Sequence, residues 1–338
     1  MIIDFEGLNK KSPSLLNGGL LTRSLWQKFF LSKSARKEKC NVLLIPGGNY
    51  SGNFFPVVTM CRNMLPFEWR ELFRYGISFL TVKLLLLRLF QSNSFKRSNG
   101  IIFLTEHAKK RIIQIIGTLS GAPKVIPHGL NQIFNNRPKI QKSISYYNIK
   151  YPFKIIYVSI IDEYKHQCSI IEAISNLRNQ NKWPITLDLI GPHYKPSLKK
   201  LYKNILKFDK NNDWVHYHGK VQYGQLPSYY QNSDIAVFAS TCENLPNILI
   251  EMMASGLPIA CSETQPMPEI LKKSGVYFNS ENPKSISDSI SELIESKELR
   301  FKLTESSYNL SKNYCWDKST NETLQFLKKV SDDFYKNK

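Results

Sequence analysis

The stretch DIAVFASTCENLPNILIEMMASGLPIACSE (234–263) decides the fold class of this chain. Its apolar runs at 234–240 and 257–262 are typical of short strands buried on both faces, and the segment 247–255 between them has the composition of a helix. A strand, a helix and a second strand in this order form a crossover that makes the two strands parallel. The stretch therefore predicts a parallel sheet, with a loop that contains glutamate beyond the end of the first strand.

The same alternation of apolar strands and helices extends along the chain in both directions. The second half contains further expected strands at 153–159, 185–190, 214–219 and 276–278. The first half contains expected strands at 41–46, 57–60, 100–105 and 124–127. Strands that alternate with helices indicate parallel sheets covered on both faces. We therefore predict an α/β protein with two doubly wound, Rossmann-like domains that face each other across a cleft.

The length of 338 residues fits two domains of ~150 residues each. We expect an N-terminal domain at 1–148, a C-terminal domain at 149–315 and a final helix at 316–338 that returns to the N-terminal domain. Asn131 to Lys150 is a polar stretch with the composition of a linker. No apolar strand precedes residue 41, so either the N-terminal domain is reduced at its start or the start of the chain is truncated or misplaced.

Positive charge is concentrated in the first half of the chain, whose net charge as a whole is +19. Residues 1–150 hold 23 Lys and Arg against 6 Asp and Glu, a balance of +17, and the remainder holds 23 against 21, a balance of +2. This asymmetry indicates an anionic partner: lipid head groups, a phosphorylated acceptor or nucleic acid. Nucleic acid is the weakest of the three, because the sequence contains no basic patch interleaved with aromatic residues; general solubility is the alternative explanation of the charge.

The most apolar stretch, 75–91, predicts a helix that either is buried in the N-terminal domain or lies at a surface. Lys83 and Arg88 interrupt it, whereas a membrane-spanning helix needs ~20 mainly apolar residues. The six cysteines are scattered without a C-x-x-C pair, which favours a reducing compartment, and no zinc-ligand spacing occurs. The N-terminus lacks the pattern of a signal peptide. We expect a cytoplasmic protein without a metal.

Residues around Pro246 predict a binding site for an anion. Proline lacks an N–H and suits the first turn of a helix, so the amides of Asn247, Ile248 and Leu249 are expected to be unpaired and to point into the cleft. Free amides at a helix N-terminus bind phosphate. Glu243 and Glu251 would accept hydroxyl groups on either side of that phosphate, as in a sugar–diphosphate–ribose ligand; alternatively, they are a turn residue and a solvated helix residue.

Other candidate residues follow the neighbouring expected strands. Lys165 comes after the strand at 153–159 and would stabilise a departing phosphate as a point charge; alternatively, it is a solvated loop lysine. Gly191 and Gly219 follow the next two strands and would allow close approaches of the backbone at the same edge.

These residues resemble the retaining glycosyltransferases of family 4, which have the two-domain GT-B fold. The resemblance is carried by an E-x7-E motif, here Glu243-NLPNILI-Glu251, and by the block GLPIACSETQPMPEIL after it. The order YVSIIDEYKHQ, LDLIGP, VHYHGKV and LPSYYQNSDIAVFAS is also similar to the family, as are IIFLTEHAKK and KVIPHGL in the first half. The resemblance covers about residues 40–330 and is looser in the first half.

The resemblance implies a hexosyltransferase that retains anomeric configuration and needs neither a metal nor a cofactor beyond its nucleotide-sugar co-substrate. Glu243 would contact the donor sugar, Glu251 the ribose, and Lys165 the leaving phosphate. The amides around Asn247 and Ile248 would hold the diphosphate. Asn63 falls about where many relatives carry a histidine, so it would contact the sugar or the acceptor; a plain turn residue is the alternative.

Three departures from the family pattern affect these expectations. Asn244 stands where many relatives have a glycine, the arginine that often precedes the lysine is absent, and the expected first strand with its Gly-rich loop is missing. The resemblance implies transfer of a sugar to a saccharide or lipid-linked saccharide in bacterial surface polysaccharide (lipopolysaccharide) synthesis, on the cytoplasmic face of an anionic membrane. A non-catalytic subunit and a nucleotide-sugar epimerase are the alternatives.

Overall fold

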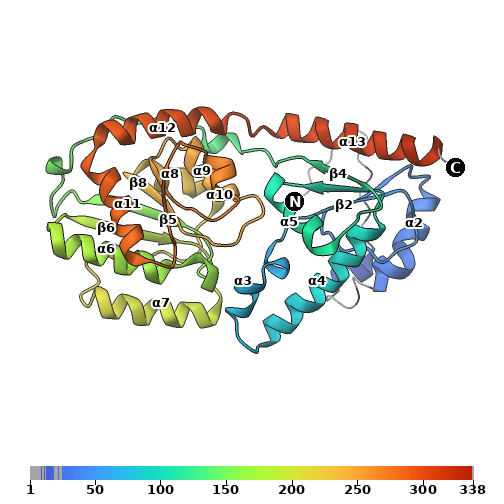
Figure 1. Cartoon of the computed structure of the whole chain (residues 1–338), viewed down its shortest axis with the longest axis horizontal. Helices are drawn as coiled ribbons and strands as arrows, with labels where there is room; N and C mark the ends of the chain where they lie inside the picture. The colour runs from blue at the N-terminus through green and yellow to red at the C-terminus, as the bar shows by residue number, and fades with distance from the viewer. Residues whose placement is uncertain (1–8, 10, 12, 19–21, 23–24, 337–338) are drawn as a thin grey trace.

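The computed structural model describes residues 9, 11, 13–18, 22 and 25–336 and places two α/β units side by side along the long axis of the molecule (Figure 1). Each unit is built around one parallel sheet. We call them the N-terminal unit, which holds β1 to β4, and the C-terminal unit, which holds β5 to β10. The predicted α/β class is confirmed.

The sheet of the C-terminal unit has six parallel strands in the order β10-β9-β8-β5-β6-β7. The strands are β5 (Phe153–Val158), β6 (Ile185–Ile190), β7 (Val215–Tyr217), β8 (Ile235–Phe238), β9 (Ile259–Ser262) and β10 (Val276–Phe278). The chain runs outward from β5 on one side and from β8 on the other, and Ile155 pairs with Ile235 where the order reverses. This is the doubly wound order predicted for this half, and ligands bind beyond the carboxyl ends of the strands at such a reversal.

Helices cover both faces of this sheet because their apolar sides match its continuous apolar runs. The helices are α6 (Gln167–Asn181), α7 (Lys195–Phe208), α8 (Leu226–Gln231), α9 (Asn247–Ala254), α10 (Met267–Leu271), α11 (Pro283–Glu295) and α12 (Lys297–Ser311). Helix α11 packs beside α6, and α12 packs beside α9. All four residues of β8 and of β9 are buried, which explains why these strands show no alternation of polar and apolar residues.

The sheet of the N-terminal unit has four parallel strands in the order β1-β2-β3-β4. They are β1 (Leu43–Ile45), β2 (Val57–Met60), β3 (Gly100–Phe103) and β4 (Ala122–Val125). This order follows the chain without a reversal in the part of this unit that the structure describes. A reversal needs a strand on the far side of β1, and the described residues before β1 form η2 (Gln27–Leu31) and α2 (Ser32–Lys37) instead.

The C-terminal helix α13 (Trp316–Lys336) lies along the N-terminal unit (Figure 1). Its Phe326 and Val330 are buried in one cluster with Val58, Ile102 and Ile126 of this unit. Helices α4 (Phe79–Arg97) and α5 (Glu106–Ile116) contribute to a separate buried cluster with β3. The sheet is therefore covered on one face by the end of the chain and on the other by its own crossover helices.

The helix expected over 75–91 corresponds to α4, and two shorter helical segments precede it. They are η3 (Leu65–Phe67) and α3 (Trp69–Phe73). The break between α3 and α4 lies at Gly76, whose φ of +59° is a conformation that glycine adopts readily. Ser78 then starts α4 by accepting the amide of Thr81 at 3.2 Å, a capping bond that competes with continuation of the previous helix.

Candidate active site

Two loops meet at the point where the strand order of the C-terminal sheet reverses. One follows β5 and contains the short helix η6 (Glu163–Lys165), and the other runs from β8 to α9. The amide of Thr241 donates to the carbonyl of Tyr164 at 3.0 Å, and the Thr241 hydroxyl lies 3.0 Å from His166 Nε2. The two loops therefore form one connected surface beyond the carboxyl ends of β5 and β8.

Lys165 and Glu243 form an ion pair between these loops. The Lys165 residue is only 6% exposed, and the Tyr157 hydroxyl donates to its carbonyl at 2.9 Å. The ammonium also lies 5.4 Å from the centre of the Phe238 ring. Lys165 is thus not a solvated loop residue. It lies in direct contact with Glu243, which was expected to contact the donor sugar while Lys165 contacts the leaving phosphate.

Glu251 is buried on α9, so it is not a solvated helix residue. Its Oε1 accepts the hydroxyl of Tyr223 at 2.9 Å, whereas its buried Oε2 has no hydrogen-bond partner among the described residues. Burial raises the pKa of Glu251 to about 7, against the lowering effect of the Tyr223 hydrogen bond. A buried carboxylate oxygen without a partner is costly, and a ligand hydroxyl group would satisfy it.

The expected row of three free amides at the start of α9 is wrong for two of its members. The Asn247 amide donates to the Leu245 carbonyl at 2.9 Å, and the Leu249 amide donates to the Pro246 carbonyl at 2.9 Å. Pro246 is the N-cap rather than the first helical residue, with ψ of 82°. The backbone therefore turns tightly before the helix, and nearby carbonyl groups accept the amides of Asn247 and Leu249. In the described chain, only the Ile248 amide of the three has no partner.

Asn244 joins the candidate site to the N-terminal unit, a role that the sequence analysis missed. Its side-chain amide donates to the Cys61 carbonyl at 3.0 Å, and its own carbonyl accepts the Thr105 hydroxyl at 3.1 Å. Cys61 follows β2 and Thr105 precedes α5, so loops after two strands of the N-terminal sheet meet the Glu243 loop. The departure from the family glycine at this position was the only signal in the sequence.

Asn63 follows β2 in the same loop as Cys61. Its side chain is exposed, and its Oδ1 accepts the Leu65 amide at 3.0 Å. Asn63 therefore has the turn role that was weighed as the alternative, and its contact with a sugar or an acceptor stays a prediction.

Gly191 and Gly219 bring the ends of β5, β6 and β7 together. The Gly191 amide donates to the Gly219 carbonyl at 2.8 Å. A Cβ atom on Gly191 would lie 2.1 Å from the Ser159 carbonyl oxygen, and the φ angles of +146° at Gly191 and +67° at Gly219 favour glycine. Both glycines therefore belong to the edge that holds Lys165.

We expect Gly191→Ala to lower the free energy of unfolding by about 3 kcal/mol, because the new methyl group would clash with the backbone carbonyl of Ser159. Urea denaturation followed by circular dichroism measures the change. Gly47→Ala is the matched control, since a Cβ at Gly47 meets nothing within 4 Å, and it should shift the value by less than about 0.5 kcal/mol. Equal losses in both variants would contradict the close approach at Gly191.

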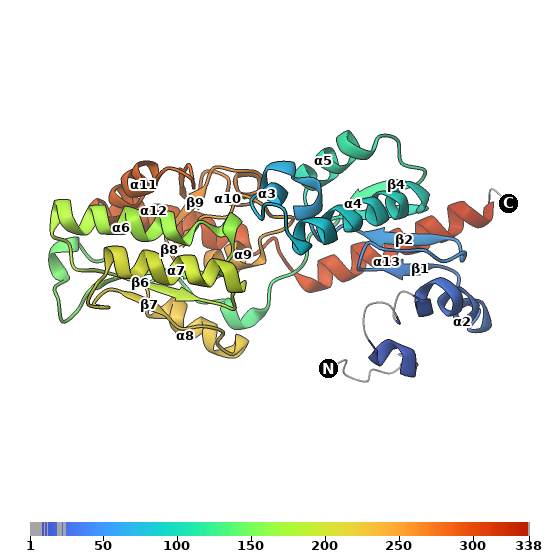
Figure 2. The ribbon, with the colours of Figure 1, turned by 90° about the horizontal axis from the view of Figure 1, so that it is seen from below.

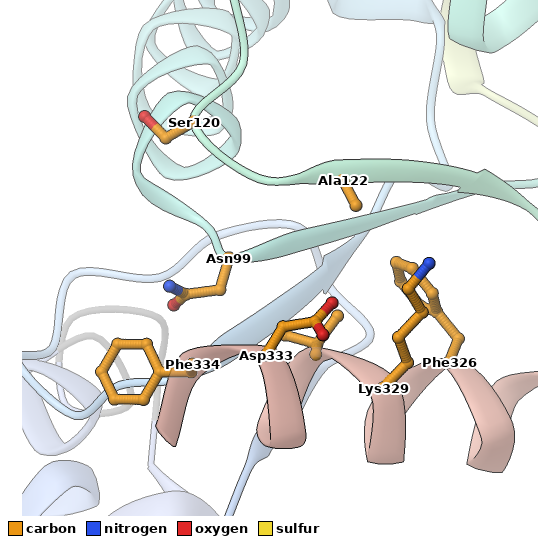
Figure 3. A pocket seen from close by; sticks show the side chains of 8 residues that line it. Asn99, Ser120, Ala122, Phe326, Lys329, Asp333 and Phe334 are labelled. Atoms are coloured by element: carbon orange, nitrogen blue, oxygen red, sulfur yellow. The ribbon is translucent and has the colours of Figure 1, made fainter. Parts of the chain in front are cut away.

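A cavity of 310 Å³ lies at the other end of the N-terminal sheet (Figure 3). It is lined by Asn99, Ser120 and Ala122, which lie just before or at the starts of β3 and β4, and by Lys329 and Asp333 of α13. Ligands of parallel sheets bind at the opposite ends of the strands, so this cavity is not the candidate site. In the part of the chain that the structure describes, no three metal-binding side chains gather.

The family described as glycosyl transferases group 1 matches residues 139–310, just over half of the 338 residues. An uncharacterized glycosyltransferase of Methanocaldococcus jannaschii is 27% identical over 137 residues, which cover 39% of each chain. O-antigen chain mannosyltransferase B of Escherichia coli is 22% identical over 191 residues, which cover 56% of this chain and 49% of the relative. The chain thus matches about half the length of these curated relatives or less.

Solved structures share the fold over more of the chain. The Anabaena protein HepE, in complex with UDP and glucose, matches with a TM-score of 0.65 and 16% identity over 81% of this chain and 72% of that chain. Alpha,alpha-trehalose 6-phosphate synthase from Burkholderia multivorans matches with a TM-score of 0.70 and 12% identity over 91% of this chain and 74% of that chain. These likenesses confirm the GT-B fold.

Proposed function

Because this chain belongs to the glycosyl transferases of group 1, we propose that it moves a hexose from a nucleotide-sugar donor, with retention of anomeric configuration. The acceptor is a saccharide or a lipid-linked saccharide of a bacterial surface polysaccharide, and the reaction takes place in the cytoplasm at the membrane. The observation that carries the proposal is the Lys165–Glu243 pair at the reversal of the C-terminal sheet.

The donor nucleotide would bind against the C-terminal unit. The unpartnered Oε2 of Glu251 is the acceptor for a ribose hydroxyl, and the free Ile248 amide is a donor to the diphosphate at the start of the same helix. HepE is similar in fold and its structure holds UDP and glucose, which supports a nucleotide-sugar donor for this chain. The thermal-shift screen described below varies the base and the sugar of the donor.

Lys165 and Glu243 would contact different parts of the donor. The Lys165 ammonium stabilises the negative charge that grows on the departing diphosphate, and Glu243 accepts hydroxyl groups of the donor sugar. The bond between the anomeric carbon and the phosphate oxygen breaks, and the acceptor hydroxyl oxygen bonds to the same carbon on the same face. Its proton passes to the departing phosphate oxygen. The chemistry requires neither a protein nucleophile nor a metal.

A thermal-shift screen of UDP-, GDP- and ADP-linked sugars tests the function. We expect one nucleotide class to raise the Tm of the wild-type protein and to leave the Tm of Glu251→Ala unchanged. Sugar release from the stabilising donor, followed with and without a saccharide acceptor, then separates the alternatives. A non-catalytic subunit would bind without turnover, and an epimerase would convert the donor sugar without an acceptor. Equal shifts in both proteins would remove the role of Glu251.

A further inference from the structure

The turn between α3 and α4, together with the outer side of α4, exposes large apolar side chains. Ile77 is fully exposed and Phe79 is 86% exposed. The other exposed residues of this surface are Trp69, Phe73, Val82, Leu86, Leu89 and Phe90. An exposed apolar area of this extent marks an interaction site on a soluble protein.

Helix α4 is apolar on its outer side as well as on its inner side, where Leu84 and Phe95 are buried. Thr81, Gln91 and Ser94 are buried against the N-terminal unit, whereas Val82, Leu86 and Leu89 face outward along one side. A water-facing helix normally buries its apolar stripe and exposes its polar one. The outer side of α4 is therefore suited to an apolar environment, which favours the surface position that the sequence analysis gave as one of two alternatives for this segment.

Helix α7 of the C-terminal unit extends the same side of the molecule. Figure 1 shows α7 and α4 on the lower side of the molecule and α12 on the upper side, and Figure 2 views the molecule from below. The Tyr75 and Tyr194 rings meet edge to face, with centroids 5.7 Å apart, where the two helices approach each other. Exposed residues of α7 include Lys199, Lys200, Tyr202, Lys203, Leu206 and Lys207. We call this surface of α3, α4 and α7 the docking face.

The charged side chains of the docking face are positive along both of its long helices, α4 and α7. Helices α4 and α7 contain no Asp or Glu over their full lengths, and Lys83 lies among the exposed apolar residues of α4. Lysines around an apolar area match an anionic lipid surface, in which head groups pair with the cations while apolar side chains enter the acyl boundary. A second copy of the chain would instead bring the same positive charges face to face.

We propose that the docking face binds the surface of an anionic phospholipid bilayer. Phe73, Ile77 and Phe79 enter the head-group layer, and the lysines of α7 contact lipid phosphates beside them. None of the described helices is long and apolar enough to cross a bilayer, so this contact is one of lying on the surface rather than spanning it.

The docking face connects directly to the candidate active site. The Tyr75 hydroxyl donates to Asp162 Oδ1 at 3.0 Å, and Asp162 caps η6, the short helix that carries Lys165. Arg74, next to Tyr75, forms an ion pair with Glu281 of the C-terminal unit. A lipid-linked acceptor held at the bilayer would thus reach the cleft beside Lys165. This step rests on the proposed function, whereas binding to the bilayer does not.

Sedimentation with vesicles tests the proposal. We expect the full chain to bind vesicles of phosphatidylcholine with phosphatidylglycerol and to remain in solution with phosphatidylcholine alone. Two variants should each weaken binding at least about tenfold, Ile77→Ser with Phe79→Ser, and Lys199→Gln with Lys203→Gln and Lys207→Gln, because they remove the apolar and the cationic contacts separately. The control, Phe301→Ser with Leu324→Ser, replaces exposed residues of α12 and α13 and should bind as the wild type does.

Three results would overturn the proposal. The wild type could fail to bind anionic vesicles, all variants could bind equally, or Ile77→Ser with Phe79→Ser could convert a dimer to a monomer without changing vesicle binding, which would make the face a self-association site. Nucleotide-sugar binding by each variant in solution serves as the fold control. Vesicle binding without any response to nucleotide sugars would refute the proposed function and leave the docking face intact.

Discussion

Glu243→Gln and Lys165→Met should each reduce kcat for sugar transfer by about 10²–10³-fold, because each removes one charge that stabilises the departing diphosphate or holds the donor sugar. The two side chains form an ion pair and are 16% and 8% exposed, respectively. Each single variant therefore also leaves its former partner unpaired in a largely buried place, which lowers the free energy of unfolding by a few kcal/mol.

The double variant, Glu243→Gln with Lys165→Met, separates catalysis from folding. Removing both charges leaves no unpaired ion, so we expect urea denaturation to show a recovery of most of the stability that each single variant loses. Transfer activity should stay at the level of the single variants or below it. Recovery of activity together with stability would mean that the pair holds the loops in place and takes no part in the reaction.

Glu251→Gln should change how the stability of the protein depends on pH. Burial raises the pKa of Glu251 from the ordinary 4.5 to about 7 in the folded chain. A group with a raised folded-state pKa contributes stability that is fully present below pH 4.5 and is lost as the pH rises through 7. The difference of 7 − 4.5 = 2.5 in pKa corresponds to on the order of 3 kcal/mol.

Unfolding free energies measured between pH 4 and pH 8 in about one-unit steps check this expectation. Relative to the glutamine variant, the wild type should lose stability progressively between pH 4.5 and 7. The exposed Glu298, replaced by glutamine, is the matched control and should follow the wild type. Parallel curves for the wild type and Glu251→Gln would show that the carboxyl group is hydrated, and the assignment of its free oxygen to a ligand would then fail.

The affinity for a nucleotide should depend on the ionisation of Glu251. Ribose hydroxyls donate hydrogen bonds, so they favour the ionised form of Glu251 and lower its pKa in the complex. The affinity of the wild type for nucleotide is then expected to weaken as the pH falls below about 7. The pH dependence should disappear in Glu251→Gln, whose side chain does not titrate in this range.

The sequence predicts those parts of the site that depend on strand ends. Lys165, Glu243 and Gly191 each follow a buried apolar run, and Gly219 follows the shorter strand β7. Because parallel strands end at one edge, the meeting of these residues follows from the alternation alone. The sequence alone does not determine whether Glu251 is buried. A glutamate in the first turns of a helix is solvated or buried according to the side chains that pack on it. Here Tyr223 donates to it.

Other features depend on local geometry or on distant segments that no pattern specifies. The amides of Asn247 and Leu249 are paired because the backbone turns tightly around Pro246, which composition does not reveal. The bond from Asn244 to Cys61 joins residues 183 positions apart. The sequence of α4 is compatible with an outward and with a buried apolar side, since a helix that is apolar almost all round does not indicate which side faces the core.

The proposed function requires that the C-terminal unit holds a nucleotide sugar with Glu251 on the ribose. Isothermal titration with the nucleotide sugar that stabilises the wild type tests it most directly. We expect saturable binding by the wild type and by Glu298→Ala, and at least about a tenfold weaker affinity for Glu251→Ala, since a hydrogen bond to a charged group contributes about 1.5–3 kcal/mol. The same affinity in all three proteins would contradict it.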